Sequence, residues 1–399
     1  MTLPLTLNTR PTGDEAPSKV PASARERFQK TYASLKQGIP DYLKYNGLPE
    51  DVLEYYTRSI DYNLPGGKQH RGVSVFETAS LLVQRELSDE EHARAIALGW
   101  AIELVRSPSP LRVRMSLIIP DAQAHAYCLV IDDMMDQSIT RRGKPCWYHV
   151  EGVGSRAIND AGIIKGAIFN IVRTHFRTQS YYSALVDILH DSMQKTVMGQ
   201  TLDLITAPED DVDLSKFSLD RHKIIVIFKT SLYSFYLPIA LALVICGFPM
   251  TGRDWWIRRP DVYKLAFEIL VPLGNLFQIQ DDYIDYAGTP KQIGKVGTDI
   301  VDNKCSWCIA TALALASPEQ RAILDASYGR KDAAAEARVK EVYREVGLDR
   351  VYAEYEERTF GRIEELVDQL SDIESPSGGA VLTKEVFRSY IAKIYNRSK

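Results

Sequence analysis

Apolar residues recur at three- and four-residue intervals along most of the chain, the spacing that places them on one face of an α-helix. Few stretches alternate apolar and polar residues as a half-buried strand does. Clusters of Gly, Pro and Asp at 206–211 and 375–379 separate the periodic stretches, and neither resembles a domain linker. The pattern predicts a mainly helical protein, with helices at 75–87, 161–177, 181–204, 223–245, 262–286, 304–315, 331–346 and 349–370.

The size and composition of the chain favour one large domain. Its 399 residues, 45% hydrophobic and 25% charged, can bury one large core or two smaller ones. Residues 1–22 are proline-containing and polar and predict a mobile lead-in without a secretory apolar core, which leaves 23–399 for the domain. The longest apolar stretch, 237–250, contains Pro and Gly and predicts a buried helix and its end, so we expect no membrane span. A net charge of −4 gives no general attraction to nucleic acid.

The five cysteines indicate a reducing compartment, because no secretion signal accompanies them. Cys305 and Cys308 have the spacing of a redox pair, but no alternation of strands and helices surrounds them. We interpret them as packing thiols and expect the protein in the cytoplasm.

Two aspartate clusters with the same internal spacing carry most of the functional signal. They are Asp132, Asp133 and Asp136, and Asp281, Asp282 and Asp285. Residues i and i+4 of a helix share a face, so each cluster directs carboxylates one way at the end of an apolar run. Buried carboxylates need a cation, and ligation by carboxylates alone favours Mg²⁺ completed by water and phosphate oxygens. The clusters predict a diphosphate clamped between two helices through Mg²⁺, with a pair of solvated helix ends as the alternative.

The flanking sequences resemble a known family. Residues 132–148 read DDMMDQSITRRGKPCWY, residues 229–238 read KTSLYSFYLP, and 277–307 contain FQIQDDYID, GKVGTDI and DNKCSW. From about Arg25 onward the chain closely resembles the farnesyl diphosphate synthases, within the trans-prenyl diphosphate synthase family. The resemblance implies an all-α fold, a single helical bundle around a deep central cavity, and a homodimer. It also implies a prenyltransferase that joins isopentenyl diphosphate to an allylic diphosphate.

The resemblance assigns roles around the allylic diphosphate. Mg²⁺, with more than one ion per site, would bridge Asp132, Asp136 and Asp281, while Asp133, Asp282 and Asp285 would complete or orient the clamp. The family's diphosphate-binding cations match Arg141, Lys229, Lys295 and Lys304.

The resemblance also assigns groups that face the carbocation left when diphosphate departs. Thr230, Gln278 and the carbonyl of Lys229 match the family's oxygen dipoles, and Tyr233 is placed to position the reacting carbons. For Thr230 and Tyr233, a role in helix packing is an equally good interpretation. The family is thought to use the released diphosphate to remove the final proton, so no protein base is expected.

A second basic pocket is implied for isopentenyl diphosphate. Its residues are Lys68, His70, Arg71, His125, Arg142, Arg397 and Lys399. His70 and His125 stand where the family usually has Asn and Gln. Because histidine titrates near neutral pH, we hypothesise weaker and more pH-dependent binding of this substrate.

Tyr127 and Cys128 match the positions that set product length in the family. Tyr127 keeps an aromatic floor while Cys128 is small, so we expect farnesyl diphosphate with geranylgeranyl diphosphate as a minor product. The alternatives are a geranyl or geranylgeranyl diphosphate synthase, a terpene cyclase on the same scaffold, and a non-catalytic partner subunit.

Residues 105–123 interrupt the resemblance, because joining 104 to 124 restores the family spacing before Asp132. The segment contains Pro108, Pro110 and Pro120, which break helices. Its first codon begins with GT and its last can be CAG, as the ends of an intron require. We hypothesise a retained intron or gene-model artefact, and lower stability and turnover if the segment is present.

Overall fold

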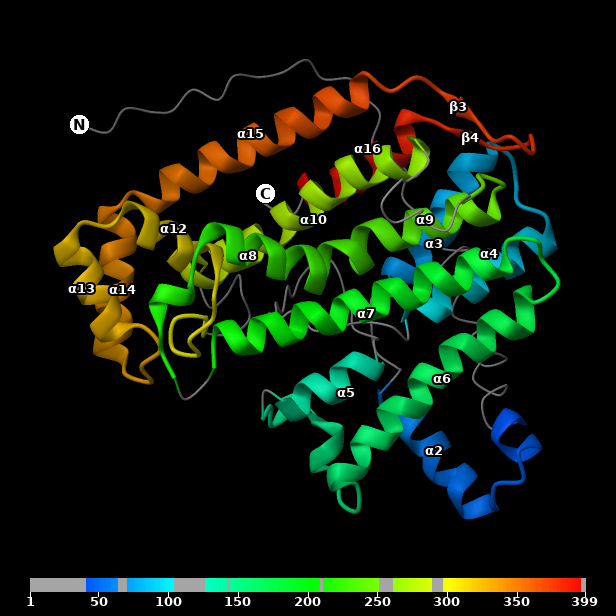
Figure 1. The fold of residues 1–399 in the computed structure, drawn as a ribbon, viewed down its shortest axis with the longest axis horizontal. Coiled ribbons are helices and arrows are strands. Elements are labelled where there is room, and N and C mark those ends of the chain that lie inside the picture. Colours follow the sequence, from blue (N-terminus) through cyan, green and yellow to red (C-terminus); the bar gives the residue numbers. More distant parts are fainter. Residues whose placement is uncertain are drawn as a thin grey trace.

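The fold is almost entirely helical, as the sequence predicts (Figure 1). This computed structural model describes residues 41–63, 70–103, 126–135, 137–141, 144–208, 211–250, 261–288 and 297–395. Its helices are α2 (Glu50–Asn63), α3 (His70–Val83), α4 (Asp89–Glu103), α5 (Ala126–Met135), α6 (Ala157–Phe176), α7 (Tyr182–Thr206), α8 (Leu219–Val226), the π-helix η4 (Ile227–Tyr236), α9 (Leu237–Ile245), α10 (Asp261–Ala287), α12 (Trp307–Leu315), α13 (Pro318–Ser327), α14 (Ala333–Glu345), α15 (Leu348–Asp368) and α16 (Lys384–Tyr395).

Short elements connect some of these helices. The antiparallel hairpins are β1 (Thr140–Arg141) with β2 (Lys144–Pro145) and β3 (Ile373–Glu374) with β4 (Val381–Leu382). Single-turn 3₁₀ helices lie at Trp147–His149, Gly154–Arg156 and Leu214–Lys216. The predicted lead-in 1–22 and the predicted insertion 105–123 lie outside the described residues.

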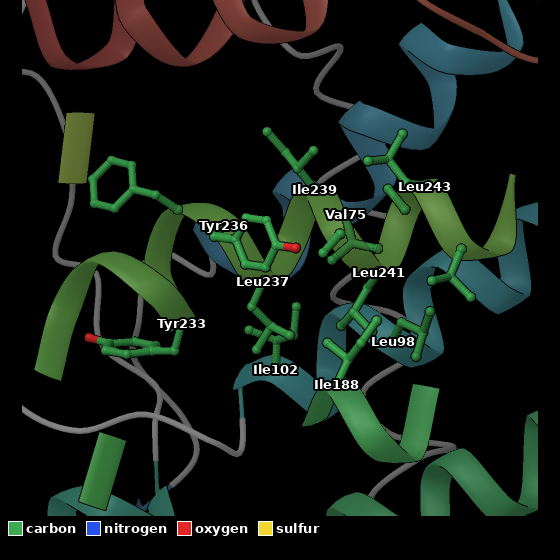
Figure 2. Packing of buried hydrophobic residues seen from close by; sticks show 14 of the residues in the cluster. Val75, Leu98, Ile102, Ile188, Tyr233, Tyr236, Leu237, Ile239, Leu241 and Leu243 are labelled. Carbon is green, nitrogen blue, oxygen red and sulfur yellow. The ribbon is translucent and has the colours of Figure 1, made fainter. Parts of the chain in front are cut away.

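The main core surrounds α9, whose residues Leu237 to Val244 are all buried. A helix that is apolar on every side belongs inside a protein, and α9 lies among α3, α4, α7 and η4. Figure 2 shows Leu237, Ile239, Leu241 and Leu243 of α9, and Tyr236 at the end of η4, beside Val75, Leu98, Ile102 and Ile188 of the neighbouring helices. The predicted buried helix is confirmed, and it ends before Gly247, which has a left-handed φ of 85°.

Two helices are long and apolar enough to cross a membrane by length and composition, Leu219–Ile245 and Asp261–Ala287. Their most apolar windows are 83% and 61% buried inside the fold. Core helices of this length meet the same criteria, so the two helices are weak evidence for a span.

The predicted helix at 223–245 contains a π-helical stretch that its spacing did not indicate. η4 lies between α7 and α10, and it comes close to both at a glycine. A Cβ added to Gly199 would lie 2.6 Å from Lys229 N, and one added to Gly274 would lie 2.7 Å from Ser231 Cβ. The broader π-helix therefore fits because these two positions carry no side chain.

Two smaller clusters of buried residues flank the main core. One joins α10, α12, α14 and α15 through Trp307, Tyr328 and Tyr343, and the other places Trp147 against α5 and α6. The prediction of a helix at 304–315 starts too early, because α12 begins at Trp307. The prediction at 75–87 runs too far, because Gln84 has a left-handed φ of 55° directly after α3.

Candidate active site

Helix α7 links the first aspartate cluster to the centre of the fold. Asp132 and Asp133 lie near the end of α5 and are each 3% exposed. Gln200 on α7 donates a hydrogen bond of 2.6 Å from Nε2 to Asp132 Oδ1. Asp136 lies outside the described residues. The first cluster is thus a buried acidic site with a fixed orientation relative to α7.

The second cluster is buried at the C-terminal part of α10, where Asp282 joins three segments. Its carboxylate accepts hydrogen bonds from His222 Nε2 at 2.8 Å, Trp307 N at 2.7 Å and Gln278 Nε2 at 3.0 Å. These partners come from α8, the start of α12 and the preceding turn of α10. Asp282 therefore acts as an anchor between helices in addition to any role toward a metal.

Asp285 anchors the segment that follows α10. Its carboxylate accepts hydrogen bonds from the backbone nitrogens of Thr298 at 3.4 Å and Asp299 at 3.0 Å. Asp281 is 3% exposed in the same helix. Within the described ranges, no three His, Cys, Asp or Glu side chains lie together in an arrangement that could hold a metal ion.

The π-helix places two of the predicted catalytic residues, Lys229 and Thr230, at a cavity that Gln278 of α10 also lines, whereas Tyr233 is not part of its lining. Thr230 Oγ1 donates to Gln278 Oε1 at 3.4 Å, and Gln278 in turn donates to Asp282. Tyr233 is fully buried (Figure 2). A 40 Å³ cavity lies at this point, and residues from α7, α8, η4, α10 and the segment before α12 line it. The lining is Asp203, His222, Ile225, Val226, Lys229, Thr230, Gln278, Asp282, Asp299, Lys304, Cys305 and Ser306.

Lys229 forms an ion pair with Asp203, whose Oδ2 lies 2.5 Å from the Lys229 Nζ. Asp203 stands three residues after Gln200 on α7, so both project toward the site. Burial raises the pKa of Asp203, but attraction by Lys229 and then Lys304 brings it below the usual value. Sequence reasoning missed Asp203, and its only signal was a lone acid within an apolar run.

The two cysteines with redox spacing are buried and form no disulfide, and Cys305 lines this cavity. Burial raises the pKa of Cys305 to about 12 and that of Cys308 well above the usual range. Cys308 Sγ donates to the carbonyl oxygen of Asp282 at 3.5 Å. Both thiols stay protonated at neutral pH, which agrees with their interpretation as packing residues.

Arg71 reaches the π-helix from α3. Its Nε donates to Ser234 Oγ at 3.0 Å, and its Cζ lies 5.3 Å from the centre of the Tyr233 ring. Of the other cations assigned to substrate, Lys304 lines the cavity. Lys68, His125, Arg142, Lys295, Arg397 and Lys399 lie outside the described residues, and the structure describes only the backbone of His70, Tyr127, Cys128 and Arg141.

The hairpin that contains Arg141 is fixed by side chains that sequence reasoning also missed. Tyr62 donates from its hydroxyl to the carbonyl of Pro145 at 2.7 Å. Just after the hairpin, Trp147 Nε1 donates to Asp160 Oδ2 at 2.7 Å, and Tyr55 donates to the same oxygen at 2.8 Å. The basic turn after the first cluster is thus tied to α2 and α6.

The polyprenyl synthetase family model matches residues 122–346. The chain belongs to this family. The farnesyl pyrophosphate synthase of Ganoderma lucidum is 46% identical over 380 residues, which cover 95% of this chain and 99% of that protein. That of Saccharomyces cerevisiae is 44% identical over 378 residues, 94% of this chain and 98% of the relative.

Solved structures of the family have the same fold. The T. brucei farnesyl diphosphate synthase complexed with homorisedronate is 28% identical to this chain with a TM-score of 0.78. The match covers 93% of this chain and 99% of that one. The predicted all-α, isoprenoid synthase type of fold and the predicted family are therefore confirmed.

Proposed function

We propose that this chain is a farnesyl diphosphate synthase, which condenses isopentenyl diphosphate with dimethylallyl diphosphate and then with geranyl diphosphate. The observation that carries the proposal is its likeness, at 43–46% identity over nearly the full length, to several farnesyl pyrophosphate synthases. The grouping of Lys229, Thr230 and Gln278 at one buried cavity supports it.

Mg²⁺ is the cofactor that the acidic residues fit. Asp132 and Asp281 offer only oxygen donors, and each is 3% exposed, where a carboxylate needs a cation close by. Asp132, Asp136 and Asp281 would hold the metal, while Asp133, Asp282 and Asp285 would orient them. Bound Mg²⁺ would supply Lewis-acid stabilisation of the negative charge on the departing diphosphate.

The residues of the cavity would hold the substrate and its reactive carbons. Lys229, Lys304, Arg141 and Lys295 would bind the allylic diphosphate. The carbonyl of Lys229 and the side chains of Thr230 and Gln278 would direct oxygen atoms at the allylic carbon, which becomes positive as the carbon–oxygen bond breaks. Tyr233, which is fully buried on the same π-helix, would help to position the reacting carbons.

Isopentenyl diphosphate would bind beside the π-helix, where Arg71 contacts Ser234 and Tyr233. Guanidinium groups suit phosphate because they donate in a fixed fork. Lys68, His70, His125, Arg142, Arg397 and Lys399 complete this part of the proposal. A retained second cationic pocket favours condensation over cyclisation, which needs only one diphosphate site.

A cytoplasmic homodimer is the form of the protein that we propose. Val197, Met198 and Ile205 on α7 are 46%, 51% and 61% exposed, which is high for large apolar side chains. A second copy covering this side of α7 would remove them from water.

Residues 105–123 are proposed to be absent from the active protein. The family match begins at residue 122. α4 precedes the segment in the chain and α5 follows it, and both helices pack on α6. Transcripts that uniformly contain these nineteen codons would refute the proposal.

The test uses the purified chain with and without residues 105–123. Each form is incubated with Mg²⁺, isopentenyl diphosphate and dimethylallyl, geranyl or farnesyl diphosphate, and the products are identified by mass spectrometry. We expect farnesyl diphosphate from the first two allylic substrates. A folded protein that lacks the segment and releases no pyrophosphate in a Mg²⁺-dependent way from geranyl diphosphate and isopentenyl diphosphate contradicts the proposed function.

A further inference from the structure

An ion pair between α7 and the π-helix forms part of the wall of the cavity. Asp203 Oδ2 lies 2.5 Å from Lys229 Nζ, and the two side chains are 14% and 6% exposed. Opposite charges attract more strongly here than at a surface, because less water screens them. The pair joins a residue assigned to the substrate with an acid that has no assigned role.

The cavity beside this pair is much smaller than a diphosphate group. Its volume is 40 Å³, and a buried water needs about 10–15 Å³ of such space, so it has room for roughly three waters. Lys229 and Lys304 both line it, together with Asp203. A diphosphate that reaches Lys229 must therefore share or displace the ammonium group that Asp203 now binds.

We propose that Asp203 is a positioning residue that holds Lys229 until a diphosphate arrives and then competes with the diphosphate for the ammonium group. This inference rests on the proposed function. The competition weakens binding of the pyrophosphate product and so favours its release. Asp203 is ionised at neutral pH and can compete, because its two lysine neighbours stabilise the carboxylate.

The test measures binding of inorganic pyrophosphate, with Mg²⁺ present, by isothermal titration calorimetry. Asp203→Asn removes the charge and keeps the shape of the side chain. We expect it to tighten pyrophosphate binding about three- to tenfold, the net scale of one hydrogen bond that no longer competes for Lys229. A residue that only stabilises the fold would leave the affinity unchanged or weaken it.

Asp191→Asn is the matched control. Asp191 lies on the same helix, three turns earlier, and pairs with Lys195 at 2.6 Å, but neither residue lines the cavity. Its substitution removes the same charge from α7 and is expected to leave pyrophosphate affinity unchanged. Asp203→Ser replaces Asp203→Asn if the latter does not give folded protein.

A double substitution identifies the lysine through which Asp203 acts. In a Lys229→Gln background, Asp203→Asn is expected to have no further effect on affinity. Equal or weaker pyrophosphate binding by Asp203→Asn overturns the inference, including the case in which Asp203 itself binds the metal. A wild-type protein that binds no pyrophosphate contradicts the proposed function instead.

Discussion

The side-chain amide of Gln200 on α7 donates a hydrogen bond to Asp132. This bond fixes the orientation of the first carboxylate in the acidic cluster on α5. The bond is 2.6 Å long and buried, and it joins residues 68 positions apart. Mutation of a partner that orients a metal ligand typically lowers metal affinity by about 10–100-fold. This contact therefore leads to the first prediction.

Replacing Gln200 by Leu should raise the Mg²⁺ concentration that gives half-maximal activity by about tenfold or more, because Asp132 loses its orienting donor. The measurement is prenyl transfer as a function of Mg²⁺ concentration. Gln194→Leu, at an exposed position of the same helix, is the control and should behave as wild type. Equal Mg²⁺ dependence in the two variants would show that Gln200 does not act on the metal ligand.

Replacing His222 by Leu should destabilise the protein by about 1–3 kcal/mol, because the buried carboxylate of Asp282 loses one of its three donors. His222→Gln retains an amide donor and should recover part of the loss. The free energy of unfolding in urea measures both effects. Leu and Gln variants of equal stability would exclude the hydrogen bond as the cause.

Replacing Gly199 by Ala should cost about 1–3 kcal/mol of unfolding free energy and lower kcat, because its Cβ meets the backbone of Phe228 and Lys229. Gly166→Ala is the matched control on α6, where a Cβ meets nothing within 4 Å. It should stabilise the protein by up to about 1 kcal/mol. The two unfolding free energies, with kcat, test the prediction, and a neutral Gly199→Ala variant would contradict it.

Alkylation of Cys246 should be slow at pH 8, because burial and then the charge of Glu91 raise the pKa of its thiol to about 12. Only the thiolate reacts, and with a raised pKa its fraction is still small at pH 10. The alkylation rate should therefore increase about tenfold between pH 9 and 10. Peptide mass spectrometry after timed iodoacetamide treatment measures this rate. A plateau near pH 9 would show an ordinary thiol.

Helical periodicity located most of the long helices, because each buries one apolar face that a spacing of three and four residues reveals. It did not reveal α2, α4, α16 or α13, the last of which is a short helix of mostly polar residues. The capping box of Ser317 and Gln320 at its start is a signal that could have found it. It also did not reveal that η4 is π-helical, because a slightly wider winding over ten residues leaves the apolar spacing almost unchanged.

The candidate site was predictable where its residues form motifs. Repeated aspartates predict a metal site from sequence alone. The structure shows that Asp132 and Asp281 are buried, and the metal stays a prediction. Asp203 was not predictable, because its partner Lys229 is 26 positions away. The donor from Trp307 to Asp282 is a backbone nitrogen and carries no sequence signal. Interactions of this kind depend on how helices pack.

The π-helix η4 also affects how the continuous helix of residues 219–245 can change during evolution. One residue inserted into an α-helix rotates everything beyond it by about 100° around the axis. For most helices that rotation would turn apolar residues toward water. Here the following segment, Leu237 to Val244, is buried on every side, so whichever side faces a given neighbour is apolar. A one-residue change in the length of η4 would therefore still leave apolar side chains facing the centre of the protein.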